Sequence, residues 1–160
     1  MSFIKSLAAG LVAAFVLLAP AQAAEKVTIA AAADLKFAMD EIAATYGVHL
    51  TSQLSFRVAD LSLIADAMAR VRATPPSALA GEPVTSVDLA TGSAELPPTD
   101  GMLFTGDRVR VVVRPSGTEP KLKCYLQVRR PAGGDLGAER ARAAVVMAQA
   151  RADMTRALGL

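Results

Sequence analysis

Residues 108–128 read RVRVVVRPSGTEPKLKCYLQV, and the fold prediction is built outward from this stretch. A turn signal at Gly106-Asp107 precedes it, so 108–113 is predicted to be a strand. Residues 123–128 form a second strand that places Cys124, Leu126 and Val128 on one face. The prolines and glycine of 114–121 predict a tight loop between the two strands.

The residues on the N-terminal side predict a strand followed by a helix. Between 49 and 58 the apolar residues alternate with polar ones, which indicates a half-buried strand. Asp60 is a good N-cap for the helix that follows, and Pro75-Pro76 ends that helix. The helix is expected to bury a stripe of Leu61, Ile64, Met68 and Val71.

The remaining segments complete a small α+β unit. We expect a turn at 80–83, a strand at 84–89 and a loop at 90–101. A final helix from about Asp135 carries the apolar stripe Ala143, Met147, Ala150, Met154 and Leu158. The predicted fold class is therefore α+β, with a three-to-four-stranded sheet and helices on one face.

The N-terminus has the three parts of a secretory signal peptide, which we assign to residues 1–23. Lys5 provides the positive charge, 7–18 is the apolar segment, and Ala21-Gln22-Ala23 is a small-x-small cleavage site. An uncleaved anchor helix is the alternative, although the apolar run is short for a membrane span. A working signal predicts a periplasmic or secreted protein, with no membrane contact after cleavage.

Residues 24–46 are predicted to form an incomplete β-α unit. The segment 26–33 reads as a strand, Asp34 as an N-cap, and the residues after it as an amphipathic helix. Together with the signal peptide, AEKVTIAAAADLKFAMDEIAATY resembles the start of a periplasmic molybdate-binding protein of an ABC transporter. That resemblance covers roughly residues 1–46 and implies an oxyanion ligand, but we carry over no binding residue from it.

The loop 114–121 has the residue types that hold a phosphate. Arg114 offers a planar fork of donors, and Ser116 and Thr118 offer hydroxyl groups. Gly117 lets backbone N–H groups approach an anion, and Lys121 and Lys123 add positive charge. We expect the Glu119 carboxylate to face away from a bound phosphate and to orient Arg114 or a lysine. A surface hairpin with ordinary turn residues is the alternative interpretation.

The motif RVRVVVRPSGTEPKLKCYLQV resembles the C-terminal domain of the α-D-phosphohexomutases, the phosphoglucomutase and phosphomannomutase superfamily. The likeness spans roughly 47–160. It implies intramolecular phosphotransfer in carbohydrate metabolism, with hexose phosphate or phosphate as the ligand. It also implies a cytoplasmic location, whereas the signal peptide predicts export. By motif match the phosphate-binding residues are Arg114, Ser116, Gly117 and Thr118, with Lys123 as a further candidate. The family's phosphoserine, Mg²⁺ and sugar-specificity loops are not recognisable in this sequence, so no catalytic or metal-binding residue is assigned.

Composition excludes some classes of protein and leaves others open. The net charge is only +2, which makes no case for nucleic acid. Cys124 and His49 are the only residues of their kinds, so neither a disulfide nor a zinc site can form within the chain. Cys124 is expected to pack in a strand. The two resemblances meet at residues 46–47, so a phosphate-binding domain, an oxyanion-transport component and a non-functional chimera all remain open, with the oligomeric state unknown.

Overall fold

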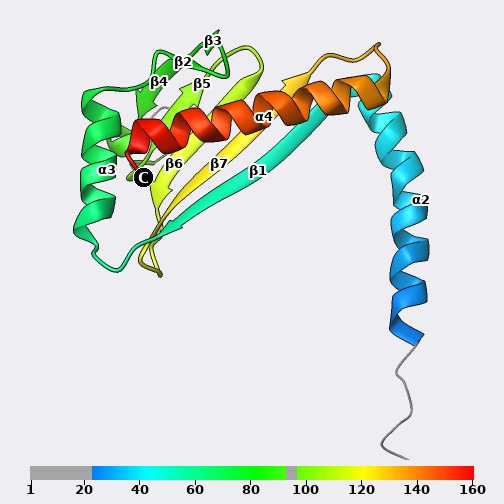
Figure 1. The fold of residues 1–160 in the computed structure, drawn as a ribbon, viewed down its shortest axis with the longest axis horizontal. Helices are drawn as coiled ribbons and strands as arrows, with labels where there is room; N and C mark the ends of the chain where they lie inside the picture. Colours follow the sequence, from blue (N-terminus) through cyan, green and yellow to red (C-terminus); the bar gives the residue numbers. More distant parts are fainter. Residues whose placement is uncertain (1–22, 93–96) are drawn as a thin grey trace, which may run out of the picture. The chain divides into compact units, whose positions relative to one another are not determined.

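The computed structural model describes residues 23–92 and 97–160, and its centre is a five-stranded antiparallel sheet (Figure 1). The strands lie in the order β1-β7-β6-β5-β4, so the last four form a meander and β1 joins it beside β7. The strands are β1 Val48–Arg57, β4 Thr85–Asp88, β5 Met102–Thr105, β6 Val109–Pro115 and β7 Lys121–Arg130. A mixed α+β fold, as predicted, is therefore observed.

Within the described residues, three α-helices and some shorter elements accompany this sheet. The helices are α2 Ala23–Tyr46, α3 Ser62–Ala73 and α4 Leu136–Leu158. The strands β2 (Ala78–Leu79) and β3 (Glu82–Pro83) pair as a small hairpin of their own. A 3₁₀ turn, η1, covers Leu89–Thr91. In the described part of the chain, no helix is long and apolar enough to span a membrane.

The core lies on one face of the sheet only. Alternate residues of β6 and β7 are buried, which is the period-two pattern of strands with one covered face. The buried residues of α3 and α4 belong to the same cluster, so both helices contribute to this covered face. We call the opposite side of the sheet the open face. Its side chains on β1, β5, β6 and β7 are half-buried or exposed.

The helix α4 confirms the prediction for the C-terminal region. Asp135 accepts a hydrogen bond from the backbone N–H of Ala138, as an N-cap should. All five residues of the predicted stripe are buried. Arg151 of α4 donates to the hydroxyl of Ser52 at 2.6 Å, which ties the helix to β1. The sequence alone thus located this helix and its buried face.

The strand and helix predicted for 49–73 are also confirmed, with one difference. Ile64, Met68 and Val71 of α3 are buried, whereas Leu61 precedes the helix and is 65% exposed. Because the helix begins at Ser62, Leu61 takes the N-cap position predicted for Asp60, and the Asp60 carboxylate accepts the backbone N–H of Ser62 at 2.9 Å from one residue earlier. The helix ends at Ala73, before the two prolines.

The predicted number of strands was too low. Residues 102–105 form β5, which the prediction of three to four strands did not include. These four residues follow a loop rich in glycine and proline, and alone they are too short to show a clear alternation. Pairing on both sides, with β4 and with β6, makes the segment a strand.

The predicted strand at 26–33 was wrong. Residues 23–46 form one continuous helix, α2, and Asp34 lies inside it instead of capping its start. Four of the eight residues predicted as strand are alanines, the best helix formers. A strand needs a neighbour for its backbone hydrogen bonds, whereas a helix makes its own, so an alanine-rich segment without a partner strand favours the helix.

The chain separates into two compact units, with the boundary between Met39 and Asp40. This boundary lies within α2, so the second unit contains the last turns of that helix together with the whole sheet, α3 and α4. The predicted signal peptide lies outside the described residues, apart from its last position.

Candidate functional site

The loop between β6 and β7 is closed by its own backbone. The N–H of Ser116 donates to the carbonyl of Lys121 at 2.9 Å, and the N–H of Lys121 donates to the carbonyl of Glu119 at 2.7 Å. The N–H of Val58 donates to the carbonyl of Pro120 at 3.0 Å, and this hydrogen bond links the loop to the end of β1. The turn therefore has a defined shape at the edge of the sheet.

Two cations lie directly opposite each other beside this turn. Arg114 on β6 and Lys123 on β7 are partners in the antiparallel register, and both side chains belong to the open face. Within the described residues, neither side chain has an ion pair or hydrogen bond. Like charges directly opposite in a sheet destabilise it. An anion placed between them would remove that repulsion.

The tip of the turn adds backbone donors. Gly117 and Thr118 are exposed, and in the part that the structure describes their N–H groups donate to no backbone or side-chain acceptor. A Cβ added at Gly117 would meet nothing within 4 Å, so the space in front of this residue is open. Free N–H groups around open space suit an oxyanion.

Glu119 balances the loop's other cations. Its carboxylate accepts from Lys121 at 2.6 Å and from Arg57 at 3.1 Å. The hydrogen bond from Lys121, together with the charges of Lys121, Arg57 and Lys123, keeps the pKa of Glu119 below its ordinary value against the opposing effect of burial. The expectation that Glu119 orients a lysine is confirmed, and in the described part of the chain Arg114 has no carboxylate partner.

Ser116 and Arg114 line different hollows. Ser116 lines a hollow of about 500 Å³ against α3, together with Leu61, Ile64 and Glu119. Arg114 lines a different hollow of about 220 Å³ on the open face. The structure thus brings Arg114 and Lys123 together and places Gly117 and Thr118 at the tip beyond them, while Ser116 faces the helix side.

Ser55 is a candidate site residue that sequence reasoning missed. It pairs with Lys123 in the register of β1 and β7, so Ser55, Lys123 and Arg114 form one row across three strands. Its hydroxyl oxygen accepts from the Gln53 amide at 2.8 Å, which leaves the hydroxyl hydrogen available as a donor. Alternation had placed Ser55 on the outward face, but only the pairing of the strands shows its neighbour.

Among the described residues, no group of three or more His, Cys, Asp or Glu side chains could bind a metal ion. These residues therefore do not fit the Mg²⁺ ion that the phosphohexomutase resemblance implies for a full-length enzyme. Cys124 is fully buried in β7, as predicted, and burial raises the pKa of its thiol to about 12. A thiol with that pKa is almost entirely protonated at neutral pH and is a poor nucleophile.

Comparison with known proteins agrees with this geometry. Residues 54–144 match the family described as phosphoglucomutase/phosphomannomutase, C-terminal domain. Over 92 residues the chain is 37% identical to the "Probable phosphomannomutase" of Haemophilus influenzae (strain ATCC 51907 / DSM 11121 / KW20 / Rd). That alignment covers 56% of this chain and 18% of the relative, so the chain spans less than a fifth of that protein's length. The matched region contains β6, the loop and β7, and the chain belongs to the family of phosphoglucomutase/phosphomannomutase C-terminal domains.

Proposed function

We propose that this chain binds the phosphate group of a hexose phosphate through Arg114, Ser116, Gly117, Thr118 and Lys123, with Ser55 as an additional donor. The observation that carries the proposal is the pair Arg114 and Lys123, which lie opposite each other and form no ion pair with any carboxylate that the structure describes. A phosphate dianion fits because it accepts bidentately from a guanidinium and also neutralises the lysine. Ser116 would have to turn its hydroxyl across the loop to join them.

Catalysis requires more than this site supplies. Phosphoryl transfer needs a nucleophile or acceptor in line with the phosphate and a cation that stabilises the developing charge. The proposed residues bind and orient an anion, and none of them is a suitable phosphoryl acceptor activated by a base. We therefore propose a phosphate-binding domain that is incomplete for mutase catalysis on its own. Export by a signal peptide at residues 1–23 remains a prediction, as does an oxyanion role for residues 24–46.

Titration with glucose 1-phosphate, followed by amide NMR on the chain that begins at residue 24, tests the proposal. We expect shifts at Ser55 and at residues 114–123, with a millimolar Kd because few contacts are made. Arg114→Gln should weaken binding about tenfold or more, since a charge-assisted pair of hydrogen bonds is lost. Arg156→Gln is the matched control, because Arg156 is exposed on α4 and only pairs locally with Asp153.

Two results would count against the proposal. Unchanged affinity in Arg114→Gln would show that the loop is an ordinary hairpin. Equal or tighter binding of molybdate at the same residues would show a general oxyanion site in place of a phosphosugar site. Lys123→Gln provides a second test, because it removes the partner cation from the same row.

A further inference from the structure

Three rows of side chains run across the strands in the middle of the open face. One is the row of Ser55, Lys123 and Arg114 already described. The next is an apolar row that ends on a polar residue, and its members in strand order are Val87, Leu103, Val112, Tyr125 and Gln53. The third row is polar without a carboxylate, with Thr85, Thr105, Arg110, Gln127 and Thr51.

Arg110 is at the centre of the third row. It lies on β6 between Thr105 and Gln127 and is exposed. It lines three neighbouring hollows on this face, of about 400, 220 and 220 Å³. Among the described residues its guanidinium has no hydrogen bond or ion pair. A planar guanidinium held by a rigid strand and left without a partner is well suited to a carboxylate or phosphate.

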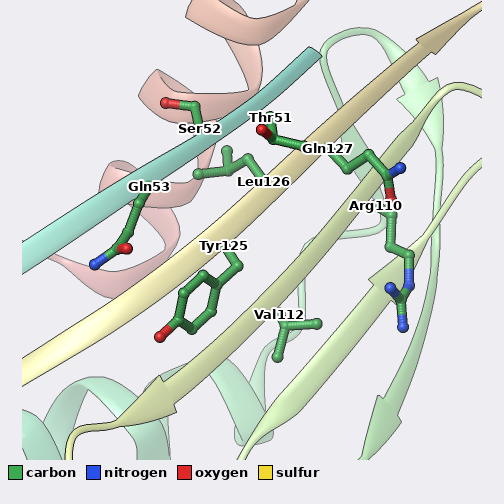
Figure 2. Close-up of a pocket in the computed structure, with 8 residues that line it drawn as sticks. All are labelled: Thr51, Ser52, Gln53, Arg110, Val112, Tyr125, Leu126 and Gln127. Carbon is green, nitrogen blue, oxygen red and sulfur yellow. The ribbon is translucent and has the colours of Figure 1, made fainter. Parts of the chain in front are cut away.

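The largest of these hollows combines that cation with a flat apolar surface and hydrogen-bonding groups. Figure 2 shows the side chains of Tyr125 and Val112 beside each other, with Gln127 extending toward Arg110. Tyr125 is 40% exposed, so part of its ring is open to a ligand. The hollow is lined by Thr51, Ser52, Gln53, Arg110, Val112, Tyr125, Leu126 and Gln127.

The surrounding charges leave Arg110 free to act on a ligand. On β6 the next cation on this face is Arg114, four residues away, roughly 13 Å at the rise of a β-strand. Arg114 shares one smaller hollow with Arg110, and Arg108 and Arg129 share another. Asp107 shares one hollow with Arg110, but in the described structure it forms no ion pair with it. Arg129 donates to the carbonyl of Asp107, and Arg108 is held by Glu82. Among the described residues, Arg110 is thus the one cation that lines the hollow of about 400 Å³, and it has no ion pair there.

We propose that the hollow around Arg110 is a second anion-binding site, separate from the loop 114–121. Its ligand is a small molecule that carries a carboxylate or phosphate on a hydroxyl-bearing ring. Arg110 binds the anionic group, the ring lies over Tyr125 and Val112, and Gln53, Gln127 and Thr51 hydrogen-bond to its hydroxyl groups. Binding pockets of this kind combine an apolar surface with a few placed polar groups.

The test uses glucuronate as the probe, with acetate as its ring-free counterpart and the full chain as the receptor. Amide and arginine Nε–H resonances are followed by NMR up to about 50 mM, where a millimolar site approaches saturation. We expect glucuronate to shift Thr51, Arg110, Tyr125 and Gln127, with an affinity several-fold higher than that of acetate. Arg110→Gln should weaken binding about tenfold, and Arg110→Lys less, because the lysine keeps the charge and loses the fork.

Matched variants separate this site from the loop. Tyr125→Ala should remove the preference for glucuronate over acetate, while Arg114→Gln and Arg156→Gln should leave the response at Arg110 unchanged. The proposal is overturned if glucuronate shifts only residues 114–123, if Arg110→Gln binds as the unmodified chain does, or if no shift occurs. Loss of glucose 1-phosphate binding in Arg114→Gln with glucuronate binding intact would show two independent sites.

Discussion

At the scale of single residues, Glu82 shows how one buried carboxylate organises a turn. Its side chain is 6% exposed and accepts from the backbone N–H groups of Arg108 and Val109, both at 2.8 Å. The Nε–H of Arg108 donates to the other oxygen at 2.6 Å. The turn that leads into β6 is held in this way, and β6 carries both Arg110 and Arg114. A residue far from the proposed sites therefore positions them.

The pH dependence of stability follows from these contacts. Burial alone would raise the pKa of Glu82, but the hydrogen bonds from Arg108 and Val109 outweigh it and hold the pKa below the ordinary value of 4.5. A carboxyl group with a lowered pKa in the folded state stabilises that state above its ordinary pKa. This contribution is lost as the pH falls below 4.5 through the lowered pKa.

We expect Glu82→Gln to lower the free energy of unfolding by about 3 kcal/mol at pH 7, because it leaves the half-buried Arg108 without its charge partner. The variant should also lose part of the acid sensitivity that the unmodified chain shows below pH 4.5. Chemical denaturation between pH 3 and pH 7 measures both effects. Glu41→Gln is the control: Glu41 is exposed on α2, and its replacement should change stability by less than about 0.5 kcal/mol. Equal losses in both variants would contradict the role given to Glu82.

At the scale of elements, Gly47 determines how α2 gives way to β1. Its N–H donates to the carbonyl of Ala43 at 2.9 Å. Its backbone φ of 90° is one that residues other than glycine rarely adopt. A Cβ at this position would lie 2.2 Å from the carbonyl oxygen of Arg130 at the end of β7. The chain can turn out of the helix and enter the sheet edge only because no side chain is present there.

Replacement of Gly47 by alanine is predicted to destabilise the second unit by more than about 3 kcal/mol. Positive φ in a residue with a side chain costs about 1–2 kcal/mol, and the clash with the Arg130 carbonyl adds to it. Gly133→Ala is the matched control, since Gly133 has a φ of 97° but no atom lies within 4 Å of an added Cβ. Thermal unfolding of the two variants separates the clash from the backbone strain. Equal destabilisation would mean that β1 and β7 move apart without cost.

At the scale of the whole molecule, the sheet, α3 and α4 belong to one compact unit that begins at Asp40. The buried residues that define this core begin at Val48 and end at Leu158. Helix α2 enters this second unit only with its last turns, where Arg140 of α4 pairs with Asp40 at 2.5 Å. The candidate phosphate site and the hollow at Arg110 both lie on the sheet.

A chain limited to residues 40–160 is therefore expected to fold cooperatively and to melt within about 3 °C of the complete protein. Its affinity for glucose 1-phosphate should be unchanged, because every proposed ligand-binding residue is retained. Differential scanning calorimetry and the NMR titration described above measure the two properties. A fall of more than about 10 °C would show that residues 1–39 contribute to the core's stability.

Much of the fold followed from local pattern. Alternation located β1 and the inward face of β7, helical spacing located the buried stripe of α4, and the turn residues located the loop at 114–121. These signals are strong because burial on one face imposes a fixed period on the sequence. The segment 26–33 shows no clear hydrophobic period, and its composition is compatible with both strand and helix. The prediction of a strand failed there for that reason.

The sequence by itself determined the α+β class, the capped C-terminal helix, the buried cysteine and a loop rich in phosphate-type donors. Only the tertiary structure decided that Arg114 and Lys123 share a row with Ser55, and that Glu119 pairs with Lys121 and Arg57. Only the structure, likewise, shows that Arg110 lines one hollow with Tyr125 and has no ion pair among the described residues. The reason is that periodicity along a strand assigns a side chain to a face, whereas its neighbours on that face depend on which strands pair and in what register.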